Sequence, residues 1–233
     1  MIYEGKAKKL WTVVGDPDLV IQEFKDDATA FNGEKRGSWA QKGEVNNQFA
    51  SAMFQMLESR GVQTHFVEKL SPIEMLIKRL EIIPLEVIVR NIAAGSFVKR
   101  YAATEGHVFL EPTFEFSYKN DSLGDPLIND SHAIALGLAT AEDIEHIRNE
   151  ALNVNRILKK YLDERGILLV DFKLEFGWHH GKILLGDEIS PDTCRFWDKA
   201  TRQKLDKDRF RQDLGNVEEA YAEILKRATE QVH

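Results

Sequence analysis

Cysteine is almost absent from this sequence, and the residue types in short supply exclude several classes of protein. The single cysteine, Cys194, cannot form an internal disulfide and excludes a cysteine-based zinc site. No apolar run approaches the length of a membrane span, and the N-terminus MIYEGKAKKLW lacks the apolar segment of a signal peptide. Basic residues are also fewer than acidic ones: the sequence has 31 Lys and Arg and 38 Asp and Glu. The resulting net charge of −7 argues against a general nucleic-acid binder. We therefore expect a cytoplasmic protein that binds neither nucleic acid nor a membrane.

The first part of the chain predicts strands and one helix. The segments KKLWTVV and LVIQEFK are typical of strands and flank GDPD, a strong turn signal. A helix is expected from Glu44 to Ser59, with Gly61 placed to end it, because apolar residues recur at helical spacing. That apolar stripe consists of Val45, Phe49, Met53, Met56 and Leu57. THFVEKL and MLIKRLEIIPLEVIVR predict further strands, with a break at Pro84.

The second part of the chain mixes helices and strands. A helix is expected after the glycine of AAGSFVKRYAATEG, and residues 112–130 are expected to be rich in loops. Thr140 and Asp143 resemble a capping pair at the start of a long helix to about Arg165. A final helix is expected over residues 213–230. The order of elements predicts an α+β protein of two lobes, residues 1–83 and 84–233, with an active-site cleft between them.

The stretch LLVDFKLEFG, residues 168–177, places charges at every second position of a predicted strand. Asp171, Lys173 and Glu175 would share one face of that strand because successive side chains point to opposite faces. The other face would carry Phe172, Leu174 and Phe176. Taken alone, this pattern is most typical of a strand with one solvated face.

A second strand, KILLGDE, follows the sequence HHG, which predicts a hairpin. A three-residue loop would set Trp178 opposite Lys182 and Lys173 opposite Asp187. Glu175 and Asp187 would then lie on one face, about 7–8 Å apart between backbones, whereas a two-residue loop would separate their faces. Two carboxylates this close can share Mg²⁺ with phosphate oxygens, or they can form a salt-bridge ladder around Lys173. The spacing leaves both interpretations open.

Two further segments can bind phosphate. Gly5 in YEGKAKKLW predicts a turn before a strand with Lys6 and Lys8 on one side, where they could contact phosphates. The alternative is an exposed edge strand whose lysines prevent aggregation. In VIVRNIAAGSFVKR, Arg90 ends a β-branched run, and Ser96 lies at the start of a predicted helix, where free N–H groups attract anions. The alternative is an ordinary serine cap beside a surface ion pair.

Arginines near the C-terminus could reach the same cleft. Arg195, in SPDTCRFWD, lies a few residues beyond Asp187, and its neighbours Phe196 and Trp197 are expected in the core. The segment DKDRFRQ supplies Arg209 and Arg211, which could equally form an exposed charged turn.

Four motifs in order give the sequence a family resemblance. YEGKAK, VIVRNIAAGSFVKR, VDFKLEFG and GDEISPDTCRFWD together resemble the SAICAR synthetases of purine biosynthesis, from about Tyr3 to Tyr221. The resemblance implies a ligase that uses ATP and Mg²⁺ to join carboxyaminoimidazole ribotide (CAIR) to L-aspartate. It also implies an N-terminal lobe like the ATP-binding lobe of kinases, and association into a homo-oligomer, a dimer.

The resemblance also implies roles for individual residues. Gly5, Lys6 and Lys8 would contact the ATP phosphates, and the lobe junction with Leu80 and Ile82 would contact adenine. Glu175 and Asp187 would bind Mg²⁺, with Lys173 and Asp171 beside the reacting groups as catalytic residues. The ribotide phosphate would be bound by Arg90, Ser96 and Arg195. Candidates for the aspartate subsite are Lys119, Asp125 and Arg211.

Two other functions remain open at this stage. A small-molecule kinase would use a similar nucleotide lobe but would stop at phosphoryl transfer. A nucleotide-binding regulatory module would use the carboxylates only as salt-bridge partners. The arginines around Ser96 favour the ligase because they suit a second phosphorylated substrate.

Overall fold

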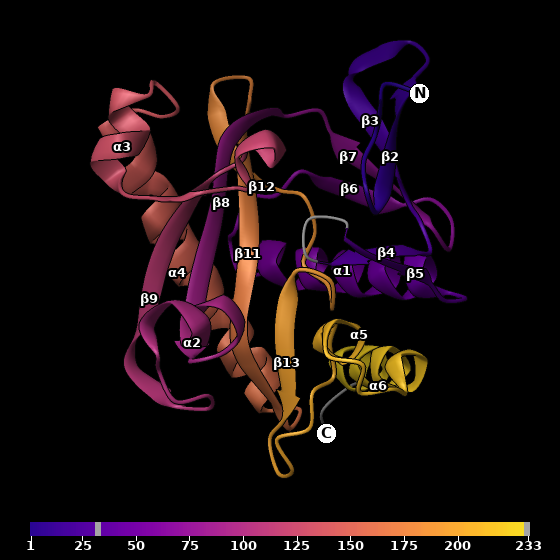
Figure 1. The fold of residues 1–233 in the computed structure, drawn as a ribbon. Helices are drawn as coiled ribbons and strands as arrows, with labels where there is room; N and C mark the ends of the chain where they lie inside the picture. The colour runs from indigo at the N-terminus through magenta and orange to yellow at the C-terminus, as the bar shows by residue number, and fades with distance from the viewer. Residues whose placement is uncertain (31–33, 231–233) are drawn as a thin grey trace.

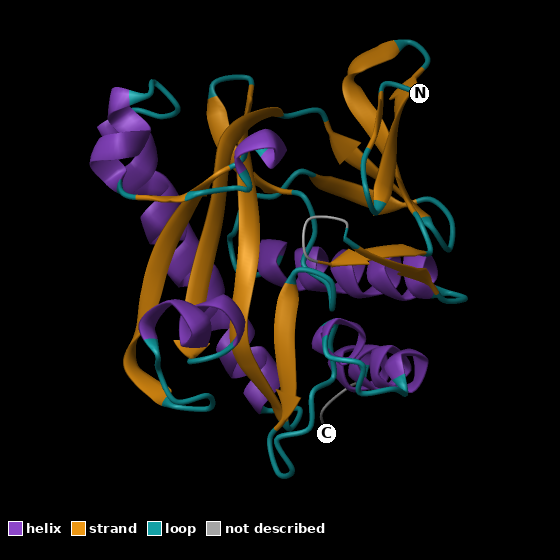
Figure 2. Ribbon diagram, viewed as in Figure 1, coloured by secondary structure: helices purple, strands orange, loops and turns teal. Residues whose placement is uncertain are grey.

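The computed structural model describes residues 1–30 and 34–230, which fold into three antiparallel sheets and the helices around them (Figures 1 and 2). The first sheet has the order β1 (Tyr3–Glu4), β2 (Lys8–Val13), β3 (Asp16–Phe24), β7 (Glu74–Lys78) and β6 (Phe66–Lys69). The second sheet has the order β10 (Leu127–Ile128), β9 (Val108–Tyr118), β8 (Glu81–Ile92), β11 (Ile167–His179) and β12 (Lys182–Gly186), and β13 (Cys194–Asp198) also pairs with β11. A third, small sheet pairs β4 (Asp27–Ala30) with β5 (Lys35–Ser38). The predicted α+β class is confirmed.

Two long helices cover the sheets. The helix α1 (Lys42–Glu58) contacts the first sheet and packs against α6 (Val217–Thr229), and α4 (Ala141–Asp163) packs against β11 and β8 (Figure 1). Shorter helical segments are α2 (Gly95–Tyr101), the 3₁₀ turn η2 (Asp121–Leu123), α3 (Asp130–Ala135) and α5 (Asp208–Arg211). No helix in the described ranges is long and apolar enough to cross a membrane.

The apolar face of β11 forms the core. Phe172, Leu174 and Phe176 are buried and join one cluster with apolar residues of α4 and of the neighbouring β8. The helix α4 begins at the predicted capping pair: the Asp143 N–H donates to Thr140 Oγ1 (3.1 Å), and the Thr140 N–H donates to Asp143 Oδ2 (2.9 Å). The apolar residues thus occupy one face of β11, which leaves its other face to carry the charges.

The predicted break at Pro84 is wrong. The strand β8 runs through Pro84, and the chain passes from the first sheet to the second at residues 79–80. Pro84 lies where the register between β8 and β11 shifts, and a strand tolerates proline at such an irregularity. Its carbonyl still accepts a hydrogen bond from Lys119 N (3.0 Å). The division into lobes at residue 83 stays a prediction.

Two other boundaries also differ from the prediction. Residues 112–118 belong to β9 rather than to a loop, because Phe114 and Phe116 alternate with polar residues despite Pro112. The expected final helix starts later, at Val217, and α5 is separate. Asp213, Gly215 and Asn216 have positive φ angles, which no continuous right-handed helix accommodates.

The hairpin between β11 and β12 has a two-residue loop, so the predicted three-residue loop is wrong. His179 pairs with Lys182, and Glu175 pairs with Gly186. His180 (φ 48°) and Gly181 (φ 74°) both have positive φ, as a tight type I′ turn requires. The predicted register, with Trp178 opposite Lys182 and Lys173 opposite Asp187, is therefore wrong by one residue.

Candidate active site

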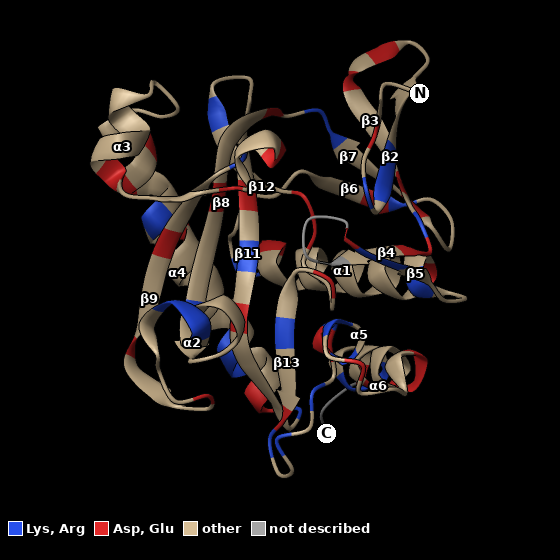
Figure 3. Cartoon of the chain, viewed as in Figure 1, with Lys and Arg blue, Asp and Glu red and all other residues tan. Residues whose placement is uncertain are grey.

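The charged face of β11 is buried and continues onto the strands beside it. Arg90 on β8 pairs in register with Asp171, and Glu86 pairs with Glu175. Figure 3 shows acidic and basic residues following one another along β11. Asp171 and Glu175 are only 3% and 4% exposed, so the simple interpretation of a solvated strand face is wrong. Buried charges need partners, and these come from several elements.

Asp187 reaches this face although the register would direct it away. The strand β12 ends at Gly186, and Asp187 adopts a left-handed conformation (φ 58°), so the alternation of the strand no longer applies. The loop 187–193 connects β12 to β13, which pair with different parts of β11. Lys173 N of β11 donates to Thr193 O of this loop (2.9 Å). Lys173 Nζ consequently lies 2.9 Å from Glu175 Oε1 and 4.0 Å from Asp187 Oδ2. Both carboxylates thus lie within reach of Lys173, although the hairpin register from which their shared face was predicted does not form.

Lys8 of β2 joins this group from the first sheet. Its Nζ pairs with the Asp187 carboxylate and lies 3.0 Å from Glu188 Oε1. Burial lowers the pKa of Lys8, but Asp187 and Glu188 outweigh burial and raise it. Burial raises the pKa of Asp187, but Lys8 and Lys173 outweigh burial and lower it. Lys8 and Asp187 therefore stay charged together, as groups that neutralise phosphates and a cation must.

The other residues predicted to bind ATP lie around this group. Gly5 N donates to Lys8 O (2.8 Å), which forms the predicted turn, and Lys6 Nζ lies 2.9 Å from Asp121 Oδ1. A Cβ atom on Gly186 would lie 2.7 Å from Leu80 Cδ1, so glycine allows Leu80 to approach the end of β12. Ile82 is 39% exposed at the start of β8.

The predicted ribotide residues form a second charged group, centred on Asp171. Arg90 Nη1 donates to Asp171 Oδ2 (2.7 Å), and Arg195 Nη1 donates to the same oxygen (2.9 Å). Arg90 Nη2 also donates to Ser96 Oγ (3.1 Å), at the start of α2. Arg195 lies so close to Gly95 that a Cβ atom there would be 2.4 Å from its Nη2. The structure thus brings Arg90, Ser96 and Arg195 together.

The candidates for the aspartate subsite are spread more widely. Arg211 Nη1 donates to Asp208 Oδ1 (2.7 Å), and Asp208 Oδ2 accepts from Arg195 Nε (2.8 Å), so Arg211 adjoins the second charged group. Lys119 Nζ lies 2.6 Å from Glu175 Oε1 and joins the first. Asp125 accepts from Asn120 N (2.8 Å) within its own loop. Arg209 donates to the carbonyls of Gly215 and Lys204, which fits the alternative of a structural turn.

Sequence analysis did not predict four acidic residues of the candidate site. Glu86 Oε1 accepts from Lys173 Nζ (2.9 Å), and Glu115 Oε1 accepts from Arg90 Nε (2.8 Å). Asp208 bridges two arginines, and Glu188 pairs with Lys8. Only Glu188, next to Asp187 in GDEISPDTCRFWD, had a local signal; the others depend on pairing between distant segments.

The acidic residues beside Lys8 fit a magnesium ion. Glu188 Oε2 is buried and has no hydrogen-bond partner among the described residues, so it has an unused acceptor. Mg²⁺ commonly takes one or two protein carboxylates and completes its shell with water and phosphate oxygens. In the described part of the chain, no cluster of three or more His, Cys, Asp or Glu residues forms a complete cage for a metal. The arrangement suits a metal ion that is bound as a complex with a nucleotide, whose phosphates supply some of its ligands.

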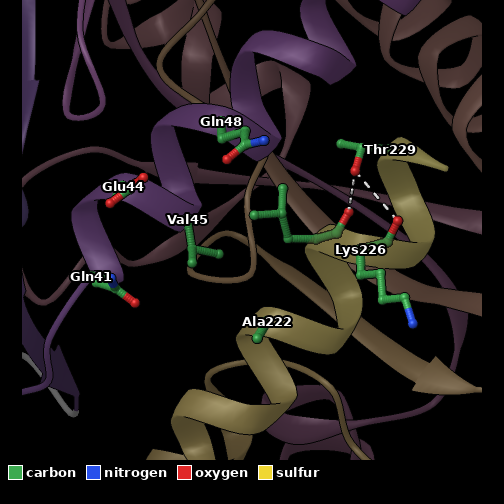
Figure 4. Close-up of a pocket in the computed structure, with 8 residues that line it drawn as sticks. Gln41, Glu44, Val45, Gln48, Ala222, Lys226 and Thr229 are labelled. Atoms are coloured by element: carbon green, nitrogen blue, oxygen red, sulfur yellow. Dashed lines mark hydrogen bonds between the residues drawn. The ribbon is translucent and has the colours of Figure 1, made fainter.

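A separate surface hollow lies between α1 and α6 (Figure 4). Its lining residues are Gln41, Glu44, Val45, Gln48, Ala222, Leu225, Lys226 and Thr229. Thr229 Oγ1 donates to the carbonyls of Leu225 and Lys226 within α6. None of the predicted site residues lines this hollow, so it is not part of the candidate site.

Comparison with known proteins identifies the family. The model of the SAICAR synthetase family matches residues 1–228. A phosphoribosylaminoimidazole-succinocarboxamide synthase of Chlorobium limicola is 60% identical over 231 residues, which cover 99% of this chain and 98% of the relative. The crystal structure of such a synthase from Ehrlichia chaffeensis has a TM-score of 0.96 and 44% identity, covering 100% of this chain and 99% of that one.

A second solved structure carries a nucleotide. It is described as a type-2 SAICAR synthetase in complex with ADP, with a TM-score of 0.95, 50% identity and 99% coverage of both chains. The family match, the curated relative and both structures span nearly all of the sequence, including the four motifs. The chain belongs to the SAICAR synthetase family.

Proposed function

We propose that this chain joins the carboxylate of CAIR to the amine of L-aspartate, with ATP as the energy source. The activity of the family, a ligase of purine biosynthesis, fits the site as described. The observation that carries the proposal is the presence of two separate charged groups along β11. Lys8, Lys173 and Asp187 form one, and Arg90, Ser96 and Arg195 form the other. A kinase of a small unphosphorylated molecule would need only the first.

The chemistry explains why both groups are needed. A carboxylate is a poor acylating agent because the amine would have to expel oxide. Transfer of the γ-phosphoryl group of ATP to the CAIR carboxylate gives an acyl phosphate and ADP. The aspartate amine then attacks the acyl carbon, phosphate leaves, and the amide SAICAR forms. The protein supplies positions and charge rather than a side-chain nucleophile.

Each charged group would have its own task. Lys8, with Lys6 and the Gly5 turn, would neutralise the ATP phosphates, and the residues at Leu80 and Ile82 would adjoin the base. Lys173 would stabilise charge that develops on the transferring phosphoryl group. Glu175, Asp187 and the neighbouring Glu188 would hold Mg²⁺, which when bound neutralises phosphate charge. Arg90, Ser96 and Arg195 would bind the ribotide phosphate, and Arg211 and Lys119 would lie nearest to L-aspartate.

Product analysis tests the proposed reaction. With ATP, Mg²⁺, CAIR and L-aspartate present, we expect equal amounts of ADP, phosphate and the new amide. Without aspartate, the amide should be absent and net ADP formation should stop at about one equivalent per site or below. Steady ADP formation with CAIR alone, without amide and indifferent to aspartate, would instead support a kinase. Sedimentation of the purified chain would test the dimer that the family resemblance implies.

A further inference from the structure

Glu86 places a second carboxylate directly opposite Glu175 in the sheet. The two residues are register partners on the adjacent strands β8 and β11. Like charges in this position repel each other, because their Cβ atoms are only about 5 Å apart. The ammonium group of Lys173 offsets this repulsion, since its Nζ lies 2.9 Å from Glu86 Oε1 and 2.9 Å from Glu175 Oε1. One lysine thus bridges two strands.

The two carboxylates around Lys173 are not equivalent. Glu175 is also 2.6 Å from Lys119 Nζ, and it belongs to the group of acidic residues that fits a metal. Glu86 comes from the middle of the sheet, on the side away from Asp187 and Glu188, which follow β12. If Glu175 and Asp187 contact a divalent cation, their charge is no longer available to Lys173. The cation would then repel the ammonium group.

We propose that Glu86 is a positioning residue that holds the Lys173 ammonium group in the site while Glu175 and Asp187 contact Mg²⁺. The proposal rests on the proposed function, because it assumes that a metal-bound triphosphate occupies the face beside β11. The charge-assisted hydrogen bond from Lys173 Nζ to Glu86 fixes the end of a flexible side chain whose other partners are engaged. Glu86 itself contacts neither the nucleotide nor the metal.

A double-mutant cycle tests this role by binding, without turnover. The four proteins are the wild type, Glu86→Gln, Lys173→Met and the double variant. The ligand is the Mg²⁺ complex of a non-hydrolysable ATP analogue, measured by calorimetry. We expect Glu86→Gln to weaken binding about tenfold in the wild-type background, as loss of one charge-assisted contact does. In the Lys173→Met background the same change should have almost no effect, because Glu86 acts through Lys173.

A matched control and a third measurement separate the alternatives. Glu111→Gln removes an exposed carboxylate from the neighbouring strand β9 and should leave binding unchanged. The Mg²⁺ concentration at half-maximal turnover should stay within about twofold of the wild type in Glu86→Gln, while kcat falls. A large rise in that concentration would make Glu86 a metal ligand and overturn the proposal. Equal weakening in both backgrounds of the cycle would overturn it as well.

Separate measurements serve as controls for folding and for the proposed function. Melting curves of each variant establish that it is folded. Glu86→Asp keeps the charge on a shorter side chain, so its affinity for the analogue should lie between those of the wild type and Glu86→Gln. If Glu86→Gln does not fold, Glu86→Asp takes its place in the cycle, and binding equal to the wild type overturns the proposal. Amide formation by the wild type reports on the proposed function alone. A chain without that activity could still show coupling between Glu86 and Lys173.

Discussion

Lys8 and Glu188 form an ion pair of 3.0 Å between Nζ and Oε1, which joins the first sheet to the loop after β12. Asp187 shares the same ammonium group. Carboxylates in such a place repel a nucleotide unless cations compensate them. If the proposed function holds, we expect Lys8 to supply positive charge from the first sheet to the phosphates.

Replacing Lys8 should mainly impair the use of ATP. We expect Lys8→Ala to raise the KM for ATP roughly ten- to a hundredfold, as loss of a contact worth about 1.5–3 kcal/mol does. The KM for CAIR should change little. Steady-state kinetics with each substrate varied in turn gives both constants. Lys9→Ala is the control, because Lys9 on the same strand pairs with Glu23 (3.4 Å).

Replacing Arg195 should mainly impair the use of CAIR. Arg195→Ala removes one of two guanidinium groups that contact Asp171, so the KM for CAIR should rise by a similar factor while the KM for ATP stays near the wild-type value. The variant must be compared after its fold is confirmed by circular dichroism, because Arg195 also binds Asp208. Equal effects of the Lys8 and Arg195 substitutions on both constants would contradict two separate phosphate sites.

Glu175→Gln tests whether the charged face of β11 takes part in catalysis. The amide keeps the size of the side chain and can still accept from Lys119 and Lys173, so the variant should fold. If Glu175 binds Mg²⁺, turnover should fall by about a hundredfold or more, with partial recovery at high Mg²⁺. Glu111→Gln, an exposed change on β9, serves as the control. Turnover close to wild type at ordinary Mg²⁺ would leave Glu175 with a structural role only.

Local sequence predicted the members of the site better than their geometry. The alternation in VDFKLEFG correctly indicated that Asp171, Lys173 and Glu175 share a face. The hairpin register failed because His180 adopts a left-handed conformation that non-glycine residues rarely take, which shortens the loop to two residues. Asp187 nevertheless approaches Lys173, since Asp187 itself adopts a left-handed conformation just after β12 ends. Local patterns predict neither conformation.

The partners of the charged residues were beyond sequence analysis for another reason. Glu86, Glu115 and Asp208 lie on segments that only the sheet pairing and the position of α5 bring to the site. A lone glutamate in a strand has no periodic signal that distinguishes an exposed side chain from the partner of a buried arginine. Such residues become visible only once strand neighbours are known.

Cys194 should be unreactive in the folded protein. It is 2% exposed, and burial raises the pKa of its thiol, which disfavours the nucleophilic thiolate. A chromogenic disulfide reagent should therefore label no cysteine in the native chain and one per chain in guanidinium chloride. Rapid labelling under native conditions, without loss of activity or secondary structure, would show that this part of β13 opens.

The stability of the chain should depend on pH through His65. Burial lowers the pKa of His65 to about 3, whereas an unfolded histidine titrates near 6.5. Between these values the unfolded chain binds an extra proton, so this contribution to stability is complete above pH 6.5 and is lost as the pH falls toward 3. The slope is at most about 1.4 kcal/mol per pH unit.

The measurement is urea unfolding from pH 4 to 7. His65→Gln should flatten the dependence of the unfolding free energy on pH in this window, whatever its effect on absolute stability. His146→Gln, an exposed change on α4, should not alter the slope. Identical slopes for the wild type and His65→Gln would mean that His65 becomes protonated in the folded chain.

The backbone at His65 also restricts how the site can open. His65 N donates to Leu185 O (2.9 Å), and Leu185 N donates to Gln63 O (3.1 Å), so β12 is tied to the chain just before β6. These bonds join the two large sheets at one edge, close to Asp187. We therefore expect nucleotide exchange to proceed by rotation about this edge, with Lys6 and Asp121 separating more than Lys8 and Asp187. Asp187 and Glu188 would then stay in contact with Lys8 while the nucleotide binds and leaves.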